Sequence, residues 1–139
     1  MKRDFVLLEH TADIGVEAYG VDLKQAFANA ARGMFSIITD LYKINEIIQH
    51  NIEATAPNQE SLLVAWLNEL VYIFDVEHII FKRFEISELD QNQIKATGYG
   101  EKVDASRHEM QVGIKAATYH MLQVARERTG YRVRVIFDI

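Results

Sequence analysis

Apolar residues recur at steps of three and four in two stretches of the chain, the spacing of a helix with one buried face. The first stripe follows Asp22, and Gln25 stands three residues after that aspartate, as in a capping box. It comprises Leu23, Phe27, Ala30, Met34, Ile37 and Leu41. The second follows Asn58, another residue type that caps helices, and is the most apolar segment of the chain. We therefore predict two helices, with the second as the central core helix.

Alternation of apolar and polar residues, the pattern of a half-buried strand, predicts strands over most of the remainder. The predicted strands cover two segments within 5–19, then 45–55, 79–87, 94–100, 111–123 and the end of the chain after Gly130. The stretch 111–123 fits either a strand or a helix. We favour a strand because Val112, Ile114 and Ala116 alternate with polar positions.

This order of elements predicts an α+β fold of layered antiparallel β-sheets with two main helices packed on one side. A length of 139 residues predicts one domain over 1–139. The chain has no cysteine, which excludes disulfides and thiolate metal sites. A net charge of −5 argues against a free-standing nucleic-acid binder. No run approaches the ~20 apolar residues of a membrane span, so we expect a cytoplasmic protein without membrane attachment.

No motif of a common catalytic or nucleotide-binding site is present, and the five histidines lack the paired spacing of a zinc site. Three single residues are candidates. Asp13 begins a strand, where an aspartate commonly bonds nearby backbone N–H groups. Lys115 fits a strand lysine that points to solvent. Asp138 shares its predicted face with Arg132 and Arg134, which favours a surface ion pair.

The last two residues offer a different interpretation of Asp138. A main-chain carboxylate on Ile139 would stand next to the Asp138 carboxylate. Two carboxylates so close repel each other unless a cation or a basic group lies between them. Oxygen ligands of this kind suit hard cations such as Ca²⁺ or Mg²⁺. The spacing by itself does not connect these residues to Asp13 or Lys115.

Five blocks, in order along nearly the whole chain, resemble the archease family. They are EHTADIG at 9–15, AFANAARGMF at 26–35, LNEL at 67–70, IKAATYH at 114–120 and VIFDI at 135–139. The resemblance implies a divalent-cation site formed by Asp13, Asp138 and the C-terminal Ile139, with Ca²⁺ as the expected ion and Mg²⁺ or Mn²⁺ as alternatives. It also implies a functional role for Lys115, of unspecified chemistry. It implies no catalytic residue and no organic cofactor.

Archeases activate the RtcB-type RNA-splicing ligase, which joins a 3′-phosphate or cyclic phosphate end to a 5′-hydroxyl end, as in tRNA splicing. The resemblance therefore implies a non-catalytic accessory protein that promotes guanylylation and multiple turnover of that ligase and meets RNA only through it. One alternative is a general chaperone or a modulator of an RNA methyltransferase. A self-sufficient metal-dependent hydrolase is disfavoured, because few acid–base groups converge.

Overall fold

The computed structural model describes residues 3–9 and 13–139, which form seven strands, two α-helices and one short 3-10 helix. The strands are β1 (Phe5–Glu9), β2 (Asp13–Gly20), β3 (Ile48–Thr55), β4 (Ile79–Leu89), β5 (Gln93–Lys102), β6 (Ala116–Glu127) and β7 (Gly130–Asp138). The helices are α1 (Leu23–Ile38), η1 (Leu41–Lys43) and α2 (Gln59–Glu77). None of the described helices is long and apolar enough to cross a membrane.

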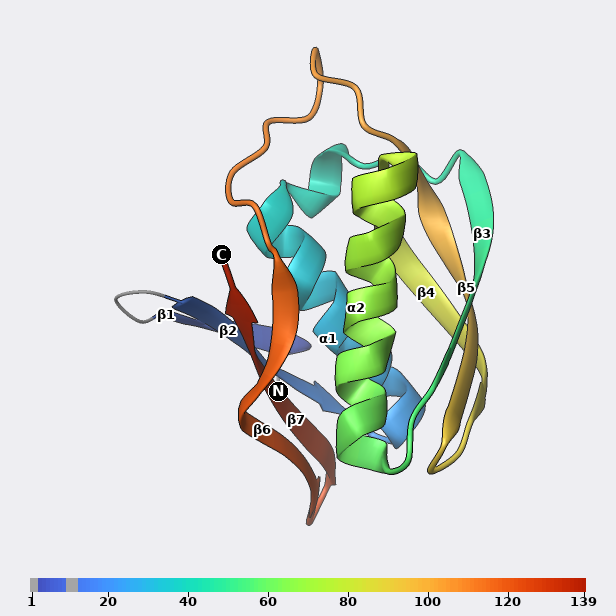
Figure 1. Cartoon of the computed structure of the whole chain (residues 1–139), viewed down its shortest axis with the longest axis vertical. Coiled ribbons are helices and arrows are strands. Elements are labelled where there is room, and N and C mark those ends of the chain that lie inside the picture. The colour runs from blue at the N-terminus through green and yellow to red at the C-terminus, as the bar shows by residue number, and fades with distance from the viewer. Residues whose placement is uncertain (1–2, 10–12) are drawn as a thin grey trace.

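The strands form two antiparallel sheets, one in the order β1-β2-β7-β6 and the other in the order β3-β5-β4. Each helix contacts both sheets, so α1 and α2 make the middle layer between them (Figure 1). The predicted α+β class with layered antiparallel sheets is confirmed. The helices pack on one face of each sheet, and that arrangement buries the apolar stripes on both sides.

The core lies where the helices meet the two sheets. Trp66 of α2 is fully buried, and its indole Nε1 donates to the carbonyl oxygen of Phe27 in α1 at 3.0 Å. Phe35 contacts Phe81 edge to face, with ring centroids 5.8 Å apart. A Cβ on Gly33 would lie 2.7 Å from Cγ1 of Val16, so the absence of a side chain lets α1 approach β2 closely.

Both predicted helix caps are confirmed. The Asp22 carboxylate accepts a hydrogen bond from the backbone N–H of Gln25 at 2.8 Å. The Asn58 side chain accepts one from the N–H of Ser61 at 2.8 Å. Each satisfies an N–H group that the first helical turn leaves without an internal partner. These local signals suffice to fix where α1 and α2 begin.

Several predicted boundaries were wrong. The first apolar stripe ran to Leu41, but α1 ends at Ile38 and Leu41 begins η1. The third strand begins at Ile48 instead of at residue 45. The strand predicted over 111–123 begins only at Ala116 and continues to Glu127. The segment 111–115 is not a strand, and the N–H of Gln111 at its start bonds to the carbonyl oxygen of Ile38 in α1.

Candidate functional site

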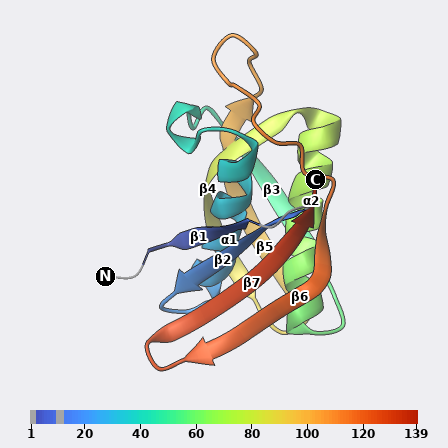
Figure 2. The ribbon, with the colours of Figure 1, turned by 90° about the vertical axis from the view of Figure 1, so that its left-hand side faces the viewer.

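Two predicted ligands, Asp13 and Asp138, lie directly opposite each other where β2 and β7 pair. Opposite residues of an antiparallel pair project to the same face, with Cβ atoms about 4.5–5.5 Å apart. Alternation along β2 places Asp13 on the face of Glu17, away from the buried Val16. Figure 2 shows β2 and β7 side by side, with the C-terminus at the end of β7. The fold therefore joins residues from opposite ends of the chain.

The arginines on this face do not pair with Asp138. Arg132 lies 3.4 Å from Glu17 and 3.0 Å from Glu127. Arg134 lies 4.0 Å from Glu17, and its Nε donates to the carbonyl oxygen of Met121 at 2.9 Å. The surface ion pair considered for Asp138 is therefore not formed with either arginine. Charge neutralisation at this end of the sheet would have to come from another source.

The Asp13 carboxylate also has capacity to bind a cation. Its Oδ1 atom is buried and makes no hydrogen bond with any residue in the described ranges 3–9 and 13–139. A buried carboxylate oxygen without a partner is costly, and a bound cation would satisfy it. Asp138 is exposed, and Ile139, which is 40% exposed, follows it directly. An all-oxygen donor set of this kind fits a hard divalent cation.

No three His, Asp or Glu side chains come together as a metal cluster within the part of the chain that the structure describes. A site here would therefore combine the two aspartates with a main-chain group, as the predicted set with Ile139 requires. Residues 10–12, which complete the block before Asp13, lie outside the described residues.

The backbone of Lys115 is bound to the same strand end. Its N–H donates to the carbonyl oxygen of Asp138 at 2.8 Å, and the next residue, Ala116, pairs with Asp138 across β6 and β7. The Lys115 side chain is exposed. Three of the predicted residues, Asp13, Lys115 and Asp138, thus meet at one end of the β2-β7-β6 sheet, with Ile139 adjoining it.

A side chain that the sequence analysis did not single out as a site residue holds this part of β6 in place. Asn68 of α2 accepts a hydrogen bond from the N–H of Ala117 at 2.7 Å and donates to the carbonyl oxygen of Ala117 at 3.3 Å. β6 is an edge strand, so these two backbone groups have no neighbouring strand on that side. The Asn68 side chain supplies the hydrogen bonds that a neighbouring strand would otherwise make. It thereby holds the backbone of β6 in place two residues after Lys115. Its position within LNEL was the only available signal.

The loop before β6, residues 103–115, is tied to the end of α1. Thr39 Oγ1 donates to the carbonyl oxygen of Glu109 at 2.8 Å. The N–H of Gln111 donates to the carbonyl oxygen of Ile38 at 2.8 Å. This long connection runs above the helices (Figure 1). The contact at Gln111 explains why β6 does not begin there, since the N–H of this residue bonds to α1 and not to β7.

A buried polar cluster secures the start of the same loop. Glu101 is 4% exposed and accepts hydrogen bonds from the N–H of Asn45 at 2.6 Å, from the Arg107 guanidinium and from Nε2 of His108 at 3.1 Å. The N–H of Asp104 donates to Nδ1 of His108 at 2.9 Å, which places the imidazole proton on Nε2.

The surroundings of Glu101 change its protonation. Burial raises the pKa of this carboxyl, but the hydrogen bonds from Asn45, Arg107 and His108 outweigh burial, so the pKa lies below its ordinary value of 4.5. Glu101 is therefore charged at neutral pH and holds the loop through charge-assisted hydrogen bonds.

The sequence matches the archease protein family over residues 5–139. The chain belongs to the archease family. Among curated relatives, the archease of Methanosarcina mazei is 38% identical over 99% of this chain and 97% of its own length. The archease of Sulfolobus acidocaldarius is 35% identical over 97% of this chain and 98% of its own length. The resemblance found in the five sequence blocks is thus confirmed.

Solved structures show the same archease architecture. Protein 1598 of Methanobacterium thermoautotrophicum, determined in solution, is 35% identical, with a TM-score of 0.84 over 98% of this chain and 99% of its own. An archease from Thermotoga maritima, described as a possible chaperone, is 22% identical, with a TM-score of 0.65 over 100% of this chain and 98% of its own. The latter likeness concerns the fold alone.

Proposed function

We propose that this protein is a non-catalytic activator of an RtcB-type RNA-splicing ligase. It promotes guanylylation and repeated turnover of the ligase and contacts RNA only through it, in the cytoplasm. Membership of the archease family supports the class of protein. The pairing of Asp13 with Asp138 is the single observation that supports the site. A divalent cation held by these carboxylates and by Ile139 would supply positive charge at the end of the sheet.

The residues of this chain contribute by shaping a docking surface. Asp13 and Asp138 repel each other when both are ionised, and neutralising that repulsion orders the end of β2 and β7. Asn68 and the hydrogen bond from Lys115 to Asp138 hold the backbone around Lys115. The exposed ammonium of Lys115 is then available to an anionic group of the ligase or its nucleotide.

Two modes of activation are open to such a surface. In the first, Lys115 reaches the nucleotide pocket of the ligase and stabilises negative charge that develops during guanylylation. In the second, the surface binds one conformation of the ligase and raises the population of the competent or product-releasing state. We favour the second mode because the site offers charge and shape but few acid–base groups.

A guanylylation assay with purified ligase, nucleotide and Mg²⁺ tests this function. Wild-type protein is expected to raise both the guanylylated fraction and the number of RNA ends joined per ligase. Asp13→Ala and Asp138→Ala should lower the stimulation by about tenfold or more, as is typical when metal coordination is disturbed. Asp75→Ala, at an exposed position on α2, is the matched control and should stimulate as the wild type does. Full stimulation by Asp13→Ala protein would refute the role of the site.

A second candidate is a general chaperone, the role suggested for the Thermotoga maritima archease. A chaperone binds clients through an exposed apolar patch of several hundred Å². The exposed large apolar residues here lie on many elements, among them Val21 before α1, Tyr42 in η1, Tyr72 in α2 and Met121 in β6. Suppression of aggregation of an unrelated protein, without any effect on ligation, would favour the chaperone. A related alternative, modulation of an RNA methyltransferase, predicts a change in methyl transfer and none in ligation.

A further inference from the structure

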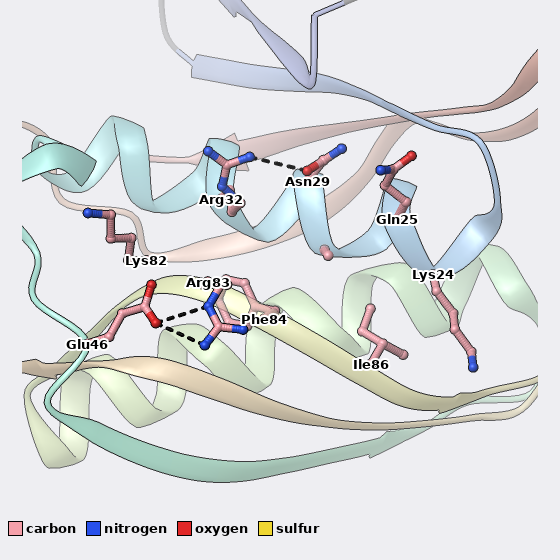
Figure 3. Close-up of a pocket in the computed structure, with 10 residues that line it drawn as sticks. Lys24, Gln25, Asn29, Arg32, Glu46, Lys82, Arg83, Phe84 and Ile86 are labelled. Atoms are coloured by element: carbon pink, nitrogen blue, oxygen red, sulfur yellow. Dashed lines mark hydrogen bonds and ion pairs between the residues drawn. The ribbon is translucent and has the colours of Figure 1, made fainter.

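A groove of about 470 Å³ runs between α1 and β4, on a part of the molecule where none of the predicted site residues lies. Figure 3 shows side chains of α1, among them Arg32, on one side of the groove and side chains of β4, among them Arg83 and Phe84, on the other. A second cavity of about 440 Å³ shares Arg32 and Lys82 with it, so the two adjoin.

The groove is positively charged in an acidic protein. Its cations are Lys24, Arg32, Lys82 and Arg83, and its only carboxylate is Glu46, which gives the lining a formal charge of +3. The whole chain carries −5, so the remainder carries −8. Cations gathered in a concave surface focus the local potential and attract anions. The charge distribution therefore points to an anionic ligand.

The cations of the groove can bind an incoming anion. Arg83 pairs with Glu46 at 2.9 Å and with Glu85 at 3.1 Å, and Arg32 pairs with Asp4 at 2.7 Å. These pairs are partly exposed, and such pairs exchange partners at little cost. Lys82 is half-buried and has no ion-pair partner within the described residues 3–9 and 13–139. Lys82 lines both cavities, so a ligand in either one could use it.

The bulges and cations along β4 also protect the edge of its sheet from pairing with another strand. β4 is an edge strand, and register shifts interrupt it between Phe81 and Arg83 and between Ile86 and Glu88. The ammonium of Lys24 also donates to the carbonyl oxygen of Ser87 at 3.2 Å. Bulges and cations of this kind hinder the addition of another strand. A ligand would therefore be recognised by side chains and not by strand pairing.

The apolar part of the groove distinguishes a peptide from a nucleic acid. Phe84 is 7% exposed and packs edge to face on Trp66 at 5.6 Å, so it offers no open ring on which a base could stack. Phe84, Ile86 and Ala28 instead present a small apolar surface beside the cations. An RNA strand that ran beyond the groove would meet the acidic remainder of the protein. A short peptide segment with carboxylates beside an apolar side chain fits both the cations and the small apolar surface of the groove.

We infer that the α1–β4 groove is a docking site for an acidic peptide segment of a partner protein, with carboxylates on Arg32 and Lys82 and an apolar side chain against Phe84 and Ile86. This inference does not depend on the cation site or on the identity of the ligase, because the groove and the site share no residue.

Fluorescence anisotropy with a labelled peptide of alternating Glu and Leu residues, eight residues long, tests the inference on the full chain. Wild-type protein should bind the peptide with an affinity that falls as salt is raised, and Arg32→Glu and Lys82→Glu should each weaken binding about tenfold. Arg128→Glu, in the exposed turn before β7, changes the net charge equally and should leave binding within about twofold. Amide NMR shifts should map the peptide to α1 and β4.

Four outcomes would overturn the inference. The first is equal weakening by Arg128→Glu, which would show an effect of net charge alone. The second is tighter binding of an eight-nucleotide oligouridylate than of the peptide, with shifts on the same residues. The third is the absence of peptide binding at low salt. The fourth is a doubling of molecular mass in light scattering that Lys82→Glu abolishes, which would assign the groove to a second copy of the chain. Circular dichroism of each variant confirms that the fold is retained.

Discussion

Asp13 and Asp138 are paired residues of β2 and β7, and their carboxylates lie on the same face of the sheet although they come from opposite ends of the chain. Like charges in this position destabilise an antiparallel pair. Arg132 and Arg134, the nearby cations on that face, pair with glutamates instead. The arrangement lowers stability in the absence of a counter-charge, and such a cost is common at functional sites.

The link between Asn68 and Ala117 gives a first prediction. Asn68→Ala leaves the N–H and carbonyl of Ala117 without partners on the edge of β6, and Ala117 is only 5% exposed. We expect a loss of about 1–3 kcal/mol in the free energy of unfolding, measured by urea denaturation. Stimulation of the ligase should fall further than this stability loss explains, because Lys115 is no longer held.

The matched control for Asn68 is Asn51→Ala, at an exposed position of β3. It should change the free energy of unfolding by less than about 0.5 kcal/mol. If Asn68→Ala protein were as stable and as active as the Asn51→Ala protein, the positioning role of Asn68 would be refuted.

Glu101 gives a prediction about pH. Its pKa is lowered in the folded state, so its contribution to stability is present above the ordinary value of 4.5 and is lost as pH falls through the lower folded value. The free energy of unfolding should therefore decrease below about pH 4.5. In Glu101→Gln protein this decrease should be smaller, and stability at pH 7 should be lower by about 1–3 kcal/mol. Urea titrations at pH 7 and at several values between 3 and 5 measure both effects. An unchanged pH profile in the variant would contradict the assignment.

An extension of the C-terminus tests the third predicted ligand. Residues added after Ile139 convert its carboxylate into a peptide group, which removes a negative charge from the proposed site. Calorimetric Ca²⁺ affinity should fall about tenfold or more, while the same tag before Met1 should have little effect. Equal affinities for the two tagged proteins would remove Ile139 from the ligand set.

Local features of this chain could be predicted from its sequence, whereas features that join distant segments could not. The caps at Asp22 and Asn58 involve hydrogen bonds to residues three positions away, and the apolar stripe of α2 follows from helical geometry. The loop over 111–115 was mistaken for a strand because Gln111 bonds to Ile38, a contact that alternation cannot reveal.

In the candidate site, too, the contacts between distant segments could not be predicted from the sequence. Asp13, Lys115, Asp138 and Ile139 were chosen because the five sequence blocks resemble a family, and spacing alone gave no connection among them. Strand pairing brings three of them together. Asn68 belongs to one of these blocks, but the sequence assigns it no role, because its hydrogen bonds to Ala117 depend on how α2 packs beside β6. The partners of Glu101 likewise come from two separate segments, Asn45 from one and Arg107 and His108 from the other.

The most direct test of the cation site compares thermal unfolding of wild-type and Asp138→Asn protein in EDTA and in saturating Ca²⁺. Loss of like-charge repulsion should make the variant the more stable protein in EDTA, by up to about 1 kcal/mol. Free Ca²⁺ at about 100 times its dissociation constant should stabilise the wild type by about 2.7 kcal/mol and reverse the order. Asp75→Asn should behave as the wild type does. Equal stabilisation of wild-type and Asp138→Asn protein by Ca²⁺, or stabilisation of neither, would contradict the account.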